Sequence, residues 1–556
     1  MYDIVPAFEF DDKADLERYE YWFLDATHSV PPWTPMFGWF WVHFCRHGMQ
    51  YGAERLSLPT VKGWDWRFKN GGGYLTLYTV QSEAERAQRE ARFRVAIRPL
   101  VENYDKVWGG FVTEILGHYA RLKATNVNTA DNIELLSNFE DTVNVTRRMW
   151  EIHMYMMYGV YTAFILFENV CKDLLGIDDT KPQFQRLLRG FDNKAFQVDR
   201  ELWQFARKAD ERGLGAAFKK PAAEVIPTLE QSDAGRKWLA EFRAFLDEDG
   251  WRMQRMAEVN LPSWVEDPTP AIANVQLYLN KGGKFNLDDE RQKLAAERAD
   301  AEKQVLERVP AAQRDWFKTM LSLAQRASSF SEEHNHYLDL YTHALIRRSS
   351  LALGKKLAAC GTIGQADDVF FLMPDEIRKV AIAPEFHNLH PIVNARRDAW
   401  TSWQKNENPP FIGKMDMMAA IGELVKSNDP IALKVVVGAM PQPQPELNAD
   451  LYGICGSSGV AEGTAKVILD EAELRNIQQG DVLVAASTAP SWTPVFSLLA
   501  GVVVDRGASL SHAAIVGREY GIPVVMNCFE GTKKIKTGQR VRVDGDRGLV
   551  FVLNNG

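Results

Sequence analysis

The spacing of hydrophobic and polar positions predicts helices over much of the chain. From about residue 80 to 260 the period is helical, with a charged stretch at 83–94 and an apolar stretch at 150–167. The apolar stretch includes His153 and is rich in Met and Tyr, and only 16 residues separate Glu151 from Glu168. It is therefore shorter and more polar than a membrane-spanning helix, and we expect a buried central helix.

One face of this central helix carries side chains that could bind a ligand. On this face, polar residues at helical spacing alternate with flexible apolar side chains. The residues of this face are His153, Met157, Val160, Phe164 and Glu168. The pattern suits a pocket for an aromatic ligand and an ordinary core face equally well, so both interpretations stay open.

A second helix is predicted to begin near Ser331, and it carries acidic and imidazole side chains. Four of them stand at offsets of 0, 4, 7 and 11 residues, which places them on one stripe at 100° per residue. They are Glu332, His336, Asp339 and His343. The stripe is either a solvated polar face or an acid–base cluster, with Tyr337 beside it. Such residues could also bind a divalent metal, but we expect none there.

The N-terminal region is rich in aromatic residues that alternate with prolines, notably at 31–35 and 37–41. Such segments line a pocket or pack a loop onto a core, and the pattern favours packing. Glycines at 71–73 lack the spacing of a Walker loop and precede a β-like run at 74–78. We therefore expect a hairpin turn there.

Near the C-terminus the pattern predicts a strand, a tight turn and a short helix. The apolar run 501–504 ends at Asp505, and a helical pattern then extends from His512 to Tyr520. Gly521 and Pro523 are typical of the end of a helix. The first turn of a helix favours a phosphate, because its N–H groups are unpaired and the helix dipole is positive there. His512 is therefore placed to carry a phosphoryl group.

Five segments between about Gly453 and Leu553 occur in the order of a known family. They are 458–463, 480–484, 488–494, 507–523 and 543–548. This region resembles the phosphohistidine, or swivelling, domain of the phosphoenolpyruvate-utilising enzyme superfamily. The resemblance implies that His512 is the phosphorylated histidine and that Gly507, Ser511 and Thr488 lie at the phosphate.

Two positions depart from the family's pattern. The family usually has two glycines before the histidine, whereas this chain has Gly507 and Ala508. The turn at Ala508 must therefore avoid backbone angles open mainly to glycine. Leu510 replaces a threonine that serves regulation in the dikinases, so we expect that mode of control to be absent.

Composition narrows the possible partners. The 556 residues are 46% hydrophobic and 25% charged, with a net charge of −8. A globular chain of several domains is expected, and the acidic balance argues against nucleic acid and anionic membranes as partners. Five cysteines without metal-type spacing indicate reduced thiols in the cytoplasm.

The predicted fold is multidomain, with a large, mainly α-helical acceptor domain followed by a small α/β domain. The boundaries are 1–437 for the acceptor or substrate-binding domain, 438–449 for a linker and 450–556 for the phosphohistidine domain. Alternating prolines at 441–445 favour an extended, semi-rigid linker.

The order of these domains resembles phenylphosphate synthase-like aryl phosphotransferases. We expect a phosphotransferase subunit that accepts a phosphoryl group on His512 from a separate ATP-grasp subunit and passes it to a small phenolic substrate. The chain itself is expected to bind no cofactor, with ATP and Mg²⁺ on the partner. An acceptor such as an antibiotic, or a phosphocarrier role, are the alternatives.

A phenol of pKa near 10 is mostly protonated at neutral pH, so its attack on phosphorus needs a base. His336, Asp339 or Glu332 could serve, with His153 and His28 as further candidates. His28 follows Trp22 and Asp25 in a pattern that resembles the opening of acceptor domains in the phenylphosphate synthase-like members. The expected substrate-binding residues are His28, His153, Met157, Phe164, Tyr337 and His343.

Overall fold

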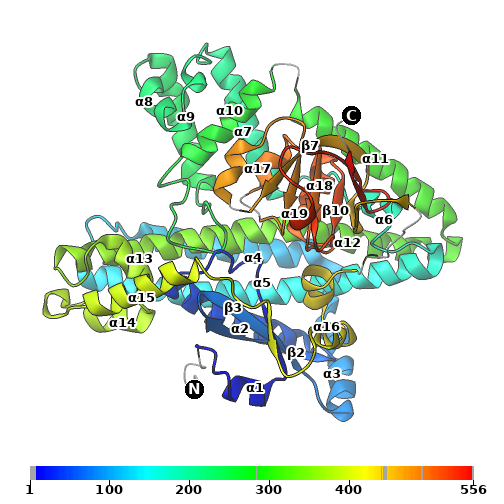
Figure 1. The fold of residues 1–556 in the computed structure, drawn as a ribbon, viewed down its shortest axis with the longest axis horizontal. Coiled ribbons are helices and arrows are strands. Elements are labelled where there is room, and N and C mark those ends of the chain that lie inside the picture. Colours follow the sequence, from blue (N-terminus) through cyan, green and yellow to red (C-terminus); the bar gives the residue numbers. More distant parts are fainter. Residues whose placement is uncertain are drawn as a thin grey trace. The chain divides into compact units, whose positions relative to one another are not determined.

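The structure, a computed structural model, describes residues 8–282, 285–439, 441, 447–469, 471–489 and 492–553. The chain divides into two compact units, each assembled from separate segments of sequence. The first unit holds residues 1–159, 250–267 and 336–427, and the second holds 160–249, 268–335 and 428–556. Figure 1 labels many of the helices and some of the strands of both units.

The first unit is mainly helical and contains one small sheet. Its helices and helical turns are α1 (Ala14–Arg18), α2 (Pro35–Leu56), α3 (Glu83–Ala96), α4 (Arg98–Ala124), the part of α5 (Asn132–Leu175) up to Gly159, η3 (Asn335–Leu340), α13 (Tyr341–Ala359), η4 (Ala366–Phe371), α14 (Pro374–Val380), η5 (Pro384–Phe386), α15 (His390–Trp403) and α16 (Met417–Lys426). Its strands are β1 (Tyr21–Leu24), β2 (Val61–Lys69), β3 (Gly72–Thr79) and β4 (Phe411–Gly413).

The four strands form an antiparallel sheet in the order β2-β3-β1-β4. Asn70 and Gly71 join β2 to β3 with φ values of 51° and 75°, as a two-residue hairpin turn requires. The predicted hairpin is therefore confirmed. Gly38 on α2 lies so close to β2 that an added Cβ would come within 2.5 Å of the Phe68 ring.

The second unit combines helices with a larger sheet. Its helices and helical turns are the rest of α5, α6 (Pro182–Arg186), α7 (Lys194–Glu211), η1 (Ala217–Lys219), α8 (Ala222–Leu229), α9 (Asp233–Asp249), α10 (Thr269–Asn280), α11 (Leu287–Arg308), η2 (Ala311–Gln313), α12 (Arg314–His334), η6 (Ala432–Val436), η8 (Glu471–Asn476), α17 (Thr493–Phe496), α18 (His512–Tyr520) and α19 (Gly531–Lys534). Its strands are β5 (Leu451–Tyr452), β6 (Ile454–Ser457), β7 (Val460–Ile468), β8 (Asp481–Ala485), β9 (Gly501–Val504), β10 (Val524–Met526), β11 (Arg540–Asp544) and β12 (Leu549–Leu553).

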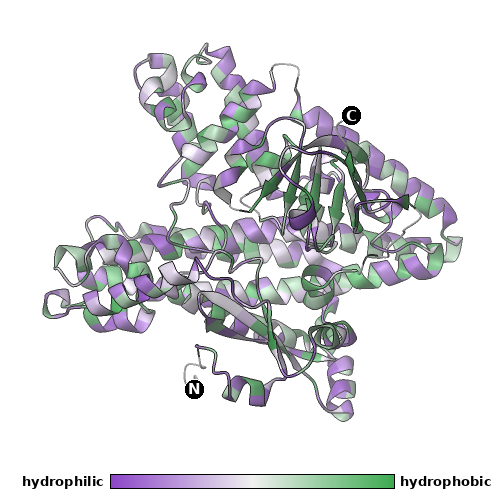
Figure 2. Cartoon of the chain, in the orientation of Figure 1, coloured by the Kyte–Doolittle hydropathy of each residue, from purple (hydrophilic) through white to green (hydrophobic). Residues whose placement is uncertain are grey.

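The eight strands have the order β5-β12-β11-β7-β8-β9-β10-β6. Neighbours from β7 to β10 are parallel, and the outer pairs are antiparallel. The central strands β8, β9 and β10 are buried along their whole length, as parallel strands covered on both faces usually are. Figure 2 shows these strands as a block of hydrophobic residues. The predicted combination of helical and α/β parts is confirmed.

Three consecutive side chains at the end of α18 tie it to helical segments of the same unit. All three are polar contacts of buried or half-buried groups. The pairs are Arg518 with Gln185, Glu519 with Arg291, and Tyr520 with Asp199. These contacts fix the C-terminal α/β region to its helical neighbours. If the region separated from them, water would have to replace each of these polar partners.

The compact units do not follow the predicted domain boundary at residue 437. Residues 160–249 and 268–335 lie in the same unit as the α/β region, because α18 is bound to them as described. The division into acceptor domain, linker and phosphohistidine domain stays a prediction. Within the predicted linker 438–449, residues 440 and 442–446 lie outside the described residues.

The apolar stretch 150–167 forms part of α5 and is largely buried, as predicted. In the part of the chain that the structure describes, no helix is long and apolar enough to cross a membrane.

Candidate functional site

His512 is the first residue of α18 and follows the carboxyl end of β9. Ser511 occupies the N-cap with φ −76° and ψ 156°, and Gly521 ends the helix in the left-handed region with φ 65°. The strand, turn and helix predicted from the sequence are therefore confirmed. N–H groups of the first turn have no carbonyl partner within a helix, so this end is suited to an anion.

Two threonine hydroxyls hold the imidazole of His512. The Oγ1 of Thr488 lies 2.8 Å from Nδ1, and the Oγ1 of Thr493 lies 3.0 Å from Nε2. The Phe496 ring meets the imidazole edge-on, with 5.5 Å between ring centroids. A hydroxyl can donate or accept, so one threonine can fix the protonated nitrogen while the other nitrogen offers its lone pair.

The family resemblance places Thr488 at the phosphate but gives no role to Thr493. Thr493 lies in segment 488–494, which carries part of the family resemblance, but its role depends on where the short helix α17 is placed. The two threonines follow β8, and His512 follows the parallel neighbour β9. Functional residues of α/β sheets commonly meet at such carboxyl ends, and this rule was the available signal for Thr493.

Gly507 and Ser511, which the family resemblance also places at the phosphate, contact side chains at the end of β10 and directly after it. The N–H of Gly507 donates to Oδ1 of Asn527 at 2.9 Å, so it is already used. The hydroxyl of Ser511 makes a weak contact with the sulfur of Met526 at 3.6 Å and does not cap α18. Asn527 also donates to the carbonyls of Val437 and Ala439. The N–H of Gly507 therefore helps to fix the turn before His512. The hydroxyl of Ser511 makes only a weak contact and is free to rotate toward a bound phosphate.

A second group of titratable residues lies in the first unit. Nδ1 of His28 lies 2.9 and 2.8 Å from the two carboxylate oxygens of Asp25. An ionised carboxylate only accepts, so Nδ1 carries the proton and Nε2 is the basic atom of neutral His28. Burial opposes protonation of His28, but the Asp25 carboxylate outweighs it, and the pKa of His28 is raised above 6.5. The Trp41 ring lies against His28, with 4.8 Å between centroids.

Asp339 and two further histidines belong to the same electrostatic cluster. Burial raises the pKa of Asp339 to about 8, although His28 opposes the rise. Oδ1 of Asp339 lies 3.4 Å from Nδ1 of His153, whose ring stacks on Trp150. Burial lowers the pKa of His343 to about 4, and its Nδ1 donates to a backbone carbonyl at 2.6 Å. At neutral pH the cluster therefore holds a protonated carboxyl and a neutral imidazole beside the His28–Asp25 pair.

The loop that carries His28 is fixed to the start of α2 through a buried glutamate. Glu258 accepts hydrogen bonds from the backbone N–H and the hydroxyl of Thr34 at 2.7 and 2.8 Å. Thr34 is the N-cap of α2, so the carboxylate lies at the positive end of that helix. The indole of Trp33 donates to the carbonyl of His28 at 2.7 Å. These contacts hold His28 in place.

The predicted acid–base stripe is buried, so its interpretation as a solvated face is wrong. Glu332, His336, Asp339 and His343 are each no more than 5% exposed. The stripe also does not run along one regular α-helix, since η3 is a π-helix inserted between α12 and α13. A π-helix has more residues per turn, so the assumed 100° per residue fails at Asn335–Leu340.

The other predicted binding residues fall into both units. His336 contacts Tyr337 edge-on in the first unit, and Met157 is buried there. Glu332 and Phe164 belong to the second unit. Phe164 packs against Phe184 as part of the core. The predicted single face of the central helix is thus divided, because α5 contributes to both units and each part packs in its own surroundings.

Asp339 allows a test of the cluster through stability. The pKa of Asp339 is about 8 in the folded protein, whereas an aspartate exposed to water has an ordinary pKa of 3.8. Between these pH values the folded state therefore keeps a proton that the unfolded state loses. The free energy of unfolding should therefore fall with rising pH, by at most about 1.4 kcal/mol per pH unit. Asp339→Asn mimics the protonated carboxyl and should unfold at a higher temperature than the natural chain at pH 7.5, with the gain vanishing near pH 4. A lower melting temperature at pH 7.5, or a gain independent of pH, would contradict this assignment.

Two family models match the chain. The model described as "Rifampicin phosphotransferase fourth domain" matches residues 151–332, and "PEP-utilising enzyme, mobile domain" matches residues 477–548, which include Thr488, Thr493 and His512. The chain belongs to the phosphoenolpyruvate-utilising enzyme superfamily. The superfamily predicted from the sequence is thereby confirmed, and the His512 site lies within its mobile domain.

Three curated proteins illustrate what the chain is similar to. "Chondramide synthase cmdD" of Chondromyces crocatus is 30% identical over 96% of this chain and 14% of its own length. "Uncharacterized phosphotransferase YvkC" of Bacillus subtilis is 27% identical over 97% of this chain and 63% of its own length. A "Rifampicin phosphotransferase" of Streptomyces sviceus is 28% identical over 60% of this chain and 36% of its own. The chain thus spans less than two thirds of each of these relatives.

Proposed function

We propose that the chain transfers a phosphoryl group through His512 to the hydroxyl group of a small organic acceptor. The observation that carries the proposal is the imidazole of His512, held by Thr488 and Thr493 at the start of a helix. Imidazole is a good nucleophile toward phosphorus, and the helix start favours the charge of the phosphoryl group. Relatives named phosphotransferases support the same reaction class.

The first half-reaction forms a bond between one imidazole nitrogen of His512 and phosphorus, and the bond from phosphorus to the donor's leaving group breaks. The threonine on that nitrogen must give up its contact, while the other threonine keeps the ring in place. In the second half-reaction the acceptor oxygen bonds to phosphorus and the nitrogen–phosphorus bond breaks. The proton of the acceptor hydroxyl has to pass to a base.

His28 is the base that we propose for the second half-reaction. Its Asp25 partner fixes the tautomer and stabilises the imidazolium that forms, as in other His–Asp pairs. Asp339, which the sequence suggested for this role, is protonated at neutral pH and is better suited to donate a hydrogen bond. His343 has a pKa of about 4 and is too weak a base.

We propose more specifically that the acceptor hydroxyl belongs to a phenol, and the aromatic side chains around His28 support this. Trp41 lies against His28, and Phe37 contacts the ring of His343 edge-on at 5.0 Å between centroids. Flat aromatic side chains of this kind stack on an aryl ring. We further propose that a separate ATP-grasp subunit, with ATP and Mg²⁺, phosphorylates His512, and that the mobile domain moves on the linker 438–449.

An aliphatic alcohol on a larger molecule such as an antibiotic is the second candidate acceptor. It is favoured by the similarity of over half the chain to proteins named rifampicin phosphotransferases. The two candidates differ in acidity, because a phenol ionises near pH 10 whereas an alcohol does not ionise in water at that pH.

Single-turnover transfer from the phosphorylated chain to matched acceptors tests the function. We expect 4-methylphenol to take the phosphoryl group from His512 and 4-methylbenzyl alcohol to take it at least tenfold more slowly. The rate with the phenol should rise with pH until the pH passes the raised pKa of His28 and then level off, because neutral His28 is the proposed base. Faster transfer to the alcohol would favour the second candidate, and transfer to neither acceptor nor to any other hydroxyl compound would refute the proposal.

A further inference from the structure

A cavity of about 670 Å³ lies within the second unit, apart from the sites described above. Its walls come from the end of α10, the start of α11, the segment 477–479 before β8, the end of α17 and the end of α18. The apolar residues that line it are Phe196, Leu277, Phe285, Leu287, Leu294, Ile477, Phe496, Leu498 and Ile522. The other half of the lining is polar or charged, so the cavity combines apolar surface with polar groups, as many small-molecule sites do.

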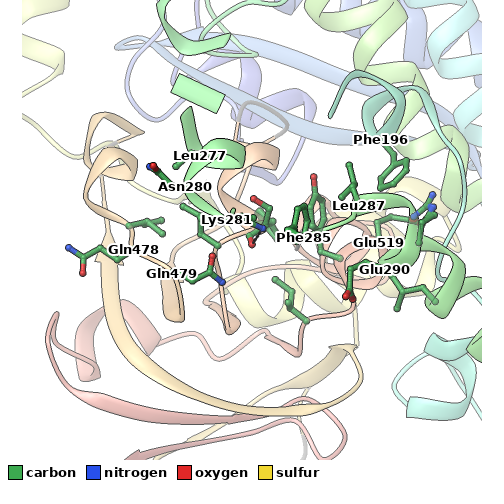
Figure 3. Close-up of a pocket in the computed structure, with 18 residues that line it drawn as sticks. Phe196, Leu277, Asn280, Lys281, Phe285, Leu287, Glu290, Gln478, Gln479 and Glu519 are labelled. Atoms are coloured by element: carbon green, nitrogen blue, oxygen red, sulfur yellow. Dashed lines mark hydrogen bonds and ion pairs between the residues drawn. The ribbon is translucent and has the colours of Figure 1, made fainter. Parts of the chain in front are cut away.

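Lys281 provides the cation of this cavity. Its Nζ donates to the carbonyl of Ser497 at 2.5 Å and lies 4.2 Å from the centre of the Phe285 ring. Among the residues that the structure describes, no carboxylate lies within 4.0 Å of Nζ. Figure 3 shows Lys281 and Phe285 side by side in the cavity.

Two other charged groups of the wall, Arg291 and Glu519, are paired with each other, and the wall also contains the carboxylate of Glu290. Arg291 pairs with Glu519, and its guanidinium lies over the Phe196 ring at 4.1 Å from the centroid. The hydroxyl of Tyr520 donates to Asp199. Among the described residues of the wall, Lys281 is therefore the cation that has no ion pair, whereas the charge of Arg291 is already opposed by Glu519.

We propose that this cavity binds a small amphipathic anion, whose carboxylate or phosphate meets Lys281 while its aromatic or aliphatic body lies against Phe285 and the apolar floor. Three uncharged polar side chains at the rim suit the remaining polar groups of such a ligand. They are Asn280, Gln478 and Gln479. Burial lowers the pKa of Lys281 to about 8, against the opposing charges of Asp199 and Glu290, and a bound anion would relieve the cost of burying the ammonium group.

The ligand of this cavity differs from the phosphoryl acceptor. His512 does not line the cavity, but Phe496 lines it and also contacts the His512 ring. Phe496 and Thr493 are the two ends of α17, and Ser497, which binds Lys281, follows directly. A bound anion would therefore act on the segment that holds His512, and its binding does not depend on the proposed phosphoryl transfer.

Calorimetric titration with three matched probes tests the proposal. The probes are 2-naphthoate, 2-naphthyl phosphate and the neutral 2-naphthamide. We expect at least one of the two anions to bind more tightly than the amide, by about 10-fold to 100-fold for a charge-assisted hydrogen bond. The comparison of the two anions tells whether the site prefers a carboxylate or a phosphate.

Lys281→Met keeps the apolar stem and removes the charge. The preference for the anion should disappear in this variant, while the affinity for 2-naphthamide should stay within about twofold of the natural chain. Lys293→Met, at an exposed position on α11 that does not line the cavity, is the matched control and should bind as the natural chain does. Equal binding of anion and amide by the natural chain, an undiminished preference in Lys281→Met, or no binding of any probe would overturn the proposal.

Discussion

Replacing His512 by Gln should abolish phosphoryl transfer, with a loss of at least about 10³-fold in the rate of acceptor phosphorylation. Glutamine keeps polar atoms near Thr488 and Thr493 but offers no nitrogen that can bond to phosphorus. The loss follows because both half-reactions pass through this one nitrogen nucleophile. The rate is measured with labelled phosphoramidate as the donor, which needs no protein partner and releases ammonia when the nitrogen–phosphorus bond to His512 forms.

His387→Gln is the matched control for this substitution, because His387 is exposed and lies outside both described sites. It should transfer phosphate at the rate of the natural chain. An His512→Gln variant that retained more than a few per cent of the natural rate would show that another group carries the phosphoryl group.

Replacing His28 by Gln should slow the second half-reaction by about 10²–10⁴-fold while His512 is still phosphorylated normally, as expected for the loss of a general base. The substitution is best studied in single turnover, by following loss of phosphate from His512 after a phenol is added. Because the base must be neutral, the natural rate should rise with pH until it passes the raised pKa of His28. The variant should lack this rise and approach the natural rate only where the phenol itself ionises.

Asp25→Asn separates positioning by Asp25 from general damage to the fold. Without the carboxylate, burial dominates the surroundings of His28 and its pKa should fall. The rise of rate with pH should then shift to lower pH, and the plateau should drop because the tautomer is no longer fixed. An unchanged pH profile in Asp25→Asn, or an unchanged rate in His28→Gln, would exclude His28 as the base.

The His512 site could be predicted from the sequence because its signals are local. A buried strand, a turn and a helix ended by Gly521 follow one another within about 20 residues, and the structure contains all of them. Local sequence signals of this kind could not predict the contact of Thr493 with His512. It depends on the pairing of β8 with β9 and on the placement of α17, which are set by tertiary packing.

The acceptor site was harder to predict because its residues are far apart in the sequence. The stripe at 332–343 was derived from regular α-helical geometry, and the π-helix at Asn335–Leu340 changes that geometry. His28 was recognised as a candidate, but its strength as a base comes from Asp25 and from burial. Similarly, nothing in the local sequence of Asp339 shows that burial keeps it protonated at neutral pH.

The most direct test of the central claim is to locate the phosphate on the phosphorylated chain. After reaction with phosphoramidate, or with ATP and an ATP-grasp partner, intact-mass measurement and peptide fragmentation under non-acidic conditions identify the modified residue. The account predicts one phosphate, on His512, that is lost to a phenol in step with formation of the phenyl phosphate ester. A phosphate on any other residue that passes to the acceptor, or acceptor phosphorylation while His512 stays unmodified, would contradict it.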